Sequence, residues 1–378
     1  MEFSCTTEDL SRGISVVERI VATKSTLPII GNILFEGEKG GLKLSANNLE
    51  VGIEIQIPAK IEKEGAILIP AKTIGGIVEK LPIGNINFKV SEKGAVKISY
   101  KQSALLIYGL APEEFPTLPK IKEGKSLQVD AELFSEMIKK TSFATSTSED
   151  KYILNGVLFE LGKTSIPGDQ SNIRLVATDG YRLAWAGERI QGAIPEVSVI
   201  IPAKALTELA RIFGDLKEKT LKITIGPDQV AFRYKDTYLV SRLIQGQFPD
   251  YKQVIPKGGE TKIFVSTKSL LQAAERAAVI ALGSANIVKF ETKGGKLHLI
   301  ANTPDIGSAD EVVDIETKGE GEAQIAFNVR LVIDALKVIG AEKIAFEVSS
   351  PLSPGMIRPA EAKNYIYIVM PIRTGEAG

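Results

Sequence analysis

Hydrophobic residues recur along this chain with two periods, one helical and one strand-like. Near the start an amphipathic helix is predicted, because the apolar positions follow helical spacing: Leu10, Ile14, Val17 and Val21. Other segments alternate between apolar and polar residues in the manner of strands, as in residues 221–243, where a Gly-Pro-Asp turn separates two runs. The pattern therefore predicts a mixture of helices and antiparallel strands.

The helical patterns occur in pairs. Long helices are predicted from Asp130 and from Ser266, because each of these residues suits an N-cap and precedes a helical apolar pattern. A shorter helix is predicted after each of three similar motifs, which are IPAK (69–72), IPAK (201–204) and FNVR (327–330). Each of three sections of the chain is thus expected to place two helices on antiparallel sheet, which is an α+β arrangement.

The same motifs return in the same order, at intervals the size of a whole domain. ILFE (33–36) recurs as VLFE (157–160) and VKFE (288–291), and each is followed by another similar strand pattern: LSANNLEVGIE (44–54), VATDGYRLAWA (176–186) and LIANTPDIGSA (299–309). FPTLPK (115–120) ends the first section as FPDYKQVIP (248–256) ends the second. We therefore predict three copies of one domain, at residues 1–122, 123–257 and 258–378.

Composition narrows the classes of function. Of the 378 residues, 44% are hydrophobic and 24% are charged, which is typical of globular domains. Lys plus Arg and Asp plus Glu both number 46, so the chain has no overall positive charge that would attract nucleic acid. Any basic surface must be local.

Such a local surface is indicated by the predicted helices, because every one of the six carries a basic pair on its polar side. The pairs are Arg12 and Arg19, Lys72 and Lys80, Lys139 and Lys140, Lys204 and Arg211, Lys268 and Arg276, and Arg330 and Lys337. Exposed helix faces favour Lys and Arg whatever their role, and neighbouring glutamates offer ordinary ion pairs. The alternative is that the six helices share one surface and sum their charges into a positive field.

The location of the protein is indicated by its lack of targeting signals. Cys5 is the only cysteine, which excludes an intrachain disulfide and favours a reducing compartment. The N-terminus has no apolar segment of signal-peptide length, and nowhere do about 18 uncharged apolar residues follow one another. We predict a soluble, cytoplasmic protein without a membrane association.

Signatures of catalysis are weak. His298 is the only histidine and alternates with Leu297 and Leu299 as a strand residue would, so a Ser-His-Asp arrangement has no good carrier. Cys and His are too few for a zinc site, and Asp305, Asp310 and Asp314 are more typical of a solvated loop or strand edge than of a cation site. We predict no cofactor, no metal and no enzyme activity.

Five stretches carry a specific resemblance: KSTLPIIGNILFE (24–36), YILNGVLFE (152–160), ATDGYRLAW (177–185), FPDYKQVIP (248–256) and YIVMPIR (367–373). With the threefold repeat, they closely resemble the bacterial DNA sliding clamps, the beta subunits of DNA polymerase III. The resemblance implies a head-to-tail homodimer closed into a ring of six domains, with twelve inner helices around duplex DNA. Such a ring is a DNA polymerase processivity factor, is placed on DNA by a clamp loader, and has no catalytic chemistry of its own.

The resemblance also implies site residues. Those expected to contact DNA are Lys24, Lys72, Ser148 and Tyr152, with Lys151 and Lys204 added for their charge and position. Those expected at the joint between subunits are Leu105, Val279 and Ile280, for which ordinary core burial is the alternative.

A peptide groove is implied between the second and third domains, with the C-terminal segment as one wall. Its partners would be the DNA polymerase III catalytic subunit, the clamp loader, other polymerases and repair proteins, through short motifs that contain Leu and Phe. Its expected lining is Leu154, Thr178, Gly180, Tyr181, Leu183, Pro249, Val254, Ile368, Met370, Pro371, Ile372 and Arg373.

Four features depart from the family pattern. Tyr181 stands where histidine is common, and Gln253 where arginine is common, so a somewhat different peptide preference is expected. The tail Thr374 to Gly378 and the insert at residues 162–172 are additions without an assigned role. Two other functions stay open on the sequence alone: a nucleotide-modifying enzyme that uses Asp179, and a DNA-binding scaffold that forms no ring.

Overall fold

The computed structural model describes residues 1–22, 27–164, 166, 169–213, 219–256, 258–259, 261–319 and 322–373. The chain divides into two compact units. Unit 1 comprises Met1–Phe134 and Glu208–Leu243, and unit 2 comprises Ser135–Thr207 and Ile244–Gly378. Two of the three borders between the units fall within helices, α3 (Ala131–Thr141) and α4 (Ala203–Phe213), and the third lies between Leu243 and Ile244.

Unit 1 contains two antiparallel sheets and the helices α1 (Thr7–Val17) and α2 (Ala71–Val78). The smaller sheet has the order β5 (Lys60–Lys63), β1 (Glu2–Thr6), β7 (Asn85–Val90), β8 (Ala95–Tyr100) and β9 (Ser103–Tyr108). The larger sheet has the order β10 (Lys125–Asp130), β15 (Thr220–Ile225), β16 (Gln229–Tyr234), β17 (Thr237–Arg242), β4 (Val51–Ile57), β3 (Gly41–Asn47), β2 (Asn32–Glu38) and β6 (Gly65–Pro70).

Unit 2 is built on one antiparallel sheet of 12 strands, with the helices α5 (Thr267–Ala281) and α6 (Val329–Val338). Its order is β14 (Val197–Pro202), β11 (Gly156–Leu161), β12 (Ile173–Thr178), β13 (Arg182–Glu188), β25 (Tyr365–Val369), β24 (Gly355–Pro359), β23 (Lys343–Val348), β18 (Thr261–Ser266), β21 (Gly307–Gly319), β20 (Lys296–Thr303), β19 (Ile287–Lys293) and β22 (Gln324–Asn328). The described residues thus form the predicted α+β fold, with six α-helices and antiparallel sheets.

The helices begin where the predicted caps lie. The Asp130 carboxylate accepts a hydrogen bond from Leu133 N at 2.9 Å, and the Ser266 hydroxyl accepts one from Ser269 N at 3.4 Å. Helix α1 buries Leu10, as its spacing predicts. The extension of that helix to Val21 was wrong, because α1 ends at Val17 and a short 3₁₀ turn (Glu18–Ile20) follows.

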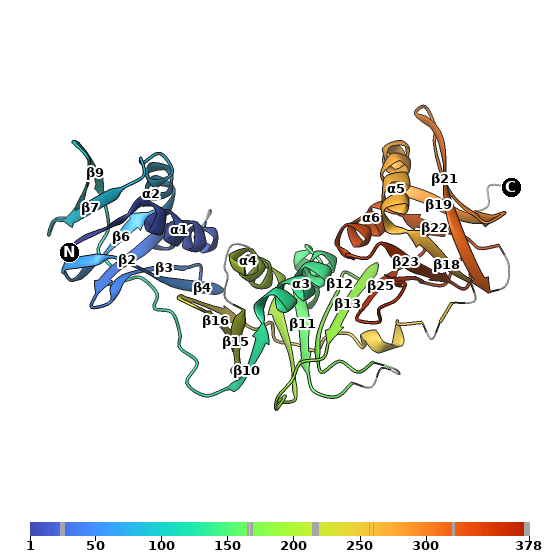
Figure 1. The fold of residues 1–378 in the computed structure, drawn as a ribbon, viewed down its shortest axis with the longest axis horizontal. Coiled ribbons are helices and arrows are strands. Elements are labelled where there is room, and N and C mark those ends of the chain that lie inside the picture. Colours follow the sequence, from blue (N-terminus) through green and yellow to red (C-terminus); the bar gives the residue numbers. More distant parts are fainter. Residues whose placement is uncertain are drawn as a thin grey trace. The chain divides into compact units, whose positions relative to one another are not determined.

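In each unit the sheet continues from one sequence repeat into the next. In unit 1, β17 pairs with β4, so that Val240 lies opposite Gly52. In unit 2, β25 pairs with β13 (Figure 1). Ile368 lies opposite Leu183, and β24 pairs with the other edge of β25. The apolar C-terminal segment is therefore an interior strand, which explains its composition.

Within the described part of the chain, no helix is both long and apolar enough to cross a bilayer.

Candidate docking site and nucleic-acid interface

A tight turn joins β12 to β13 at Thr178–Arg182. The Asp179 carboxylate closes it by accepting hydrogen bonds from the backbone N–H of Tyr181 at 2.8 Å and of Arg182 at 3.0 Å. Thr178 Oγ1 accepts one from Gly180 N at 3.1 Å and donates one to the Arg182 carbonyl at 2.6 Å. Gly180 has a φ of +94°, a left-handed conformation that favours glycine.

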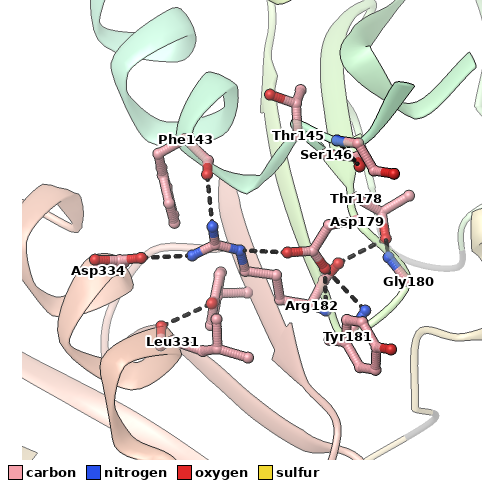
Figure 2. A network of polar contacts seen from close by, with 12 residues as sticks. Phe143, Thr145, Ser146, Thr178, Asp179, Gly180, Tyr181, Arg182, Leu331 and Asp334 are labelled. Carbon is pink, nitrogen blue, oxygen red and sulfur yellow. Dashed lines mark hydrogen bonds and ion pairs between the residues drawn. The ribbon is translucent and has the colours of Figure 1, made fainter. Parts of the chain in front are cut away.

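The turn is tied to other segments through the Arg182 guanidinium (Figure 2). It contacts the Asp179 carboxylate at 3.0 Å, the Asp334 carboxylate of α6 at 2.6 Å and the Phe143 carbonyl at 2.8 Å. Burial alone would lower the pKa of Arg182, but neighbouring Tyr367, Asp334 and Asp179 raise it. Asp179 therefore serves the turn, which leaves its carboxylate poorly placed as the general acid or base of a nucleotide-modifying enzyme.

An apolar cluster lies beside the turn and includes the only tryptophan. Its buried members come from β11 to β14, β25 and the segment that follows β17: Leu158, Val176, Leu183, Trp185, Ile200, Ile244, Tyr251 and Ile368. The Tyr251 hydroxyl donates a hydrogen bond to Glu160 at 2.7 Å. Burial, and then Glu160, raise the pKa of Tyr251, so its hydroxyl keeps its proton.

The twelve predicted groove residues divide by exposure. Thr178, Leu183 and Ile368 are buried, and Leu183 and Ile368 belong to the apolar cluster. Leu154, Pro371 and Ile372 are half-buried, whereas the exposed members are Gly180, Tyr181, Pro249, Val254, Met370 and Arg373. Met370 N donates a hydrogen bond to the Tyr181 carbonyl at 2.9 Å, which brings the C-terminal segment beside the turn.

Large apolar side chains are therefore exposed above a buried apolar floor. Tyr181 is 64% exposed, Val254 41% and Met370 37%. The other departure from the family pattern, Gln253, donates a hydrogen bond from its side chain to Asp250 at 2.8 Å.

Sequence reasoning missed Arg182, Trp185 and Asp334. The Arg182 position could have been recognised from its spacing to Asp179, but nothing in the sequence connects either residue to Asp334.

Two of the residues predicted to contact DNA occupy equivalent positions in the repeats. Lys72 and Lys204 are exposed in the first turns of α2 and α4, and neither has a carboxylate within ion-pair distance among the described residues. Ser148 and Tyr152 are also exposed, at the start of the 3₁₀ segment Glu149–Asn155. Lys24 lies outside the described residues.

Lys151 behaves differently from the other predicted cations. Its ammonium donates a hydrogen bond to the Asp179 carbonyl at 2.9 Å and lies 5.0 Å from the centre of the Tyr181 ring. Lys151 therefore lies against the turn at Thr178–Arg182.

The cations of the predicted basic pairs are partly neutralised. Ten of them lie on the six helices, but Arg19 lies in the 3₁₀ turn after α1 and Lys80 lies beyond the end of α2. Arg12 and Lys140 are half-buried and the other ten cations are exposed. Six of the twelve make ion pairs with nearby carboxylates: Arg12 with Asp9, Lys80 with Glu79, Lys139 with Glu136, Arg211 with Glu208, Arg276 with Glu311 and Lys337 with Glu275. The ion pairs fit the interpretation of ordinary exposed helix faces. Six cations make no ion pair within the described part of the chain: Arg19, Lys72, Lys140, Lys204, Lys268 and Arg330. A positive surface shared by all six helices stays a prediction.

The residues predicted at a subunit joint come from both units: Leu105 lies in unit 1, and Val279 and Ile280 lie in unit 2. Leu105 is half-buried in β9, an edge strand of the smaller sheet, and its neighbours Leu106 and Tyr108 are 59% and 72% exposed. On α5, Val279 is 70% exposed and Ile280 is half-buried. Leu106 and Tyr108 were missed by sequence reasoning, although a strand with four consecutive apolar residues at 105–108 must place two of them on each face.

The described residues contain no group of three or more His, Cys, Asp or Glu side chains that could hold a metal ion. His298, the only histidine, has its Nδ1 2.9 Å from a carboxylate oxygen of Asp310 across neighbouring strands, which is an ordinary surface pairing.

Comparison with known proteins agrees with this architecture. The family described as DNA polymerase III beta subunit matches in three parts: its N-terminal domain at residues 1–119, its central domain at 128–250 and its C-terminal domain at 252–373. The beta sliding clamps of Bacillus subtilis and of a Synechocystis species are each 32% identical to this chain; both alignments cover 99% of it, with 100% and 99% of the relatives.

Solved structures agree as well. The sliding clamp of Bacillus subtilis superposes with a TM-score of 0.92 at 31% identity, over 99% of each chain. The DNA polymerase III beta subunit of Thermotoga maritima gives 0.91 at 33% identity, over 99% of this chain and 100% of that one. The repeated α+β domains define a clamp-type protein. The chain belongs to the family of bacterial DNA polymerase III beta subunits.

Proposed function

We propose that this protein is a sliding clamp, the processivity factor of a DNA polymerase. Two copies join head to tail into a ring of six domains, with domain boundaries at residues 1–122, 123–257 and 258–378. The ring encircles duplex DNA in the cytoplasm and has no catalytic chemistry of its own. The observation that carries the proposal is the match of all three family domains, in order, over nearly the whole chain.

Contact with DNA has to be weak and blind to sequence, because tight or specific binding would stop the ring from sliding. Lysines that face the phosphate backbone supply such an attraction. Lys72 and Lys204 suit this role because they are exposed and lack ion-pair partners in the described part of the chain. Ser148 and Tyr152 join them, with Lys24 on the family resemblance. Because Lys151 is held by Asp179 and Tyr181, we assign it to the docking turn.

Ring closure uses different surfaces at the two ends of the chain. A head-to-tail joint is heterologous, so a patch on one domain meets a different patch on its partner. The edge strand β9 offers unpaired backbone groups and the apolar side chains of Leu105, Leu106 and Tyr108. Val279 and Ile280 of α5 offer an apolar patch for the opposite side of the joint.

Partner proteins dock at the groove of unit 2. Exposed Tyr181, Val254 and Met370 above the buried cluster form an apolar surface that suits Leu and Phe anchors of short peptides. The flexible thioether of Met370 adapts to different side chains, which fits one site that serves the polymerase, the clamp loader and repair proteins in turn.

Deletion of Met370 to Gly378 tests the proposal. Because the deleted segment follows β25, we expect the protein to sediment as a dimer as before, while a labelled hexapeptide with Leu and Phe anchors no longer binds. Retained peptide affinity would contradict the groove, and a monomeric full-length protein would contradict the ring. Stimulation of long-product DNA synthesis on loaded circular DNA, absent on unloaded DNA, is the corresponding functional measurement.

A further inference from the structure

Arg182 connects the docking turn to a helix that lies outside the groove. Its guanidinium reaches the Asp334 carboxylate at 2.6 Å, and Asp334 belongs to α6 in the third sequence repeat. The remaining donors reach Asp179 at 3.0 Å, within the turn, and the Phe143 carbonyl at 2.8 Å. Figure 2 shows the guanidinium between these three groups.

The contacts hold Arg182 in one orientation. Only 12% of its side chain is exposed, and the ring centre of Phe143 lies 5.3 Å from the guanidinium carbon. The planar guanidinium presents several donors in fixed directions, and lysine cannot reproduce this geometry. The turn is therefore fixed from outside as well as by its own hydrogen bonds.

Fixing the turn also fixes part of the groove. Tyr181 directly precedes Arg182, and its carbonyl accepts the hydrogen bond from Met370 N at 2.9 Å. A shift of the turn would move Tyr181 and the C-terminal wall together. A rigid binding surface loses less conformational freedom when a peptide binds, so it binds more tightly.

The equivalent turn in unit 1 lacks this tie. Asn48 accepts hydrogen bonds there from Glu50 N and Val51 N as Asp179 accepts them from Tyr181 and Arg182. Val51, the counterpart of Arg182, is a buried apolar residue. The arginine is thus not needed to form the turn, which points to a role in what the turn supports.

We propose that Arg182 is a positioning residue of the docking groove, and that Asp334 on α6 contributes to peptide affinity through it without touching the peptide. The proposal rests on the groove assigned above. Asp334 is 46% exposed, and without it the Arg182 guanidinium keeps its contacts with Asp179 and the Phe143 carbonyl, so the protein is expected to fold normally.

The test uses full-length protein and a fluorescently labelled hexapeptide with one Leu and one Phe anchor. For Asp334→Asn we expect binding weaker by about three- to tenfold, since one charged contact of a positioned arginine is lost. Asp334→Glu keeps the charge and should restore most of the affinity. Arg182→Lys should weaken binding by a similar factor, and the double variant Arg182→Lys with Asp334→Asn should be no weaker than the worse single variant.

A matched control comes from an ion pair between α5 and α6. Glu275 pairs at 3.0 Å with Lys337, which is also on α6, so Glu275→Gln removes a comparable surface ion pair and should leave peptide binding unchanged. If Asp334→Asn bound the peptide as tightly as the wild type does, the inference would be overturned. The groove assignment would still stand in that case, because the wild type binds the peptide. Absence of peptide binding by the wild type would instead overturn the groove itself.

Discussion

The junction of β4 with β17 in unit 1 and that of β13 with β25 in unit 2 share one backbone design. In each, a turn closed by an Asn or Asp side chain leads into a strand that pairs with the last strand of the following repeat. Arg242 N donates to the Glu50 carbonyl at 3.0 Å as Met370 N donates to the Tyr181 carbonyl at 2.9 Å. Leu49, with a φ of +75°, takes the place of Gly180.

The side chains on this common backbone differ. Glu50, Gly52 and Arg242 of unit 1 stand where unit 2 has Tyr181, Leu183 and Met370. The pocket at the unit 1 junction has a volume of about 240 Å³ and a mixed lining, in which the charged Glu50 and Arg242 lie beside apolar residues such as Leu49 and Val240. Leu118 covers Gly52, because a Cβ at position 52 would lie only 2.8 Å from Leu118 Cγ. The two junctions thus share a backbone design, whereas among the described residues the exposed apolar surface that we propose for docking lies at the junction of unit 2.

The largest effect is expected from shortening a side chain of the buried apolar cluster in unit 2. Ile368 is 1% exposed, so Ile368→Ala should lower the free energy of unfolding of unit 2 by about 2–5 kcal/mol through lost burial and a cavity. Urea unfolding followed by Trp185 fluorescence reports this directly, because Trp185 belongs to the same cluster.

The matched change in unit 1 is Val240→Ala, at the position opposite Gly52. It should destabilise the protein less, because it removes fewer carbon atoms, and leave peptide affinity unchanged. If Val240→Ala weakened peptide binding as much as Ile368→Ala, the assignment of docking to the unit 2 junction would fail.

A smaller effect concerns acid stability. Glu347 in unit 2 is 2% exposed; burial alone would raise its pKa, but hydrogen bonds from Gly259 N, Arg358 and Lys262 lower it below the ordinary 4.5. Its contribution to stability is therefore complete above pH 4.5 and is lost as the pH falls through the lower folded-state pKa. Glu347→Gln should cost about 2 kcal/mol at neutral pH.

Glu347→Gln should also lose less stability than the wild type on acidification, because it lacks the carboxylate that becomes protonated. The measurement is the urea midpoint of Trp185 fluorescence between pH 7 and pH 3. A wild-type midpoint that rose on acidification would contradict the assigned direction of the pKa shift.

The smallest effect is expected at Lys151, the second tie on the unit 2 turn. Lys151 contacts Asp179 and the Tyr181 ring at the protein surface, where solvent weakens such interactions. Lys151→Ala should therefore weaken peptide binding only about twofold. DNA binding measured against salt concentration is the control. Removal of Lys204 should reduce the slope of the logarithm of the DNA-binding constant against the logarithm of salt concentration by about one. Removal of Lys151 should leave this slope unchanged.

Much of the architecture could be read from residue patterns. The period of Leu10, Ile14 and Val17 predicted α1, and Asp130 and Ser266 marked the starts of α3 and α5, because apolar spacing and capping are local properties. The threefold motif order predicted the repeated α+β domains for the same reason. The apolar end of the chain was recognised as structured, but its position between β13 and β24 depends on pairing with distant residues.

The amino-acid order alone thus specified the helices, the repeats and the family, since each depends on neighbouring residues or on short motifs. Tertiary structure decided which predicted side chains are buried, such as Leu183 and Ile368, and which cations are already engaged, such as Lys151. It also joined Arg182 to Asp334 on α6. A contact between residues so far apart in the chain leaves no periodic trace, because only folding brings their charges within reach of each other.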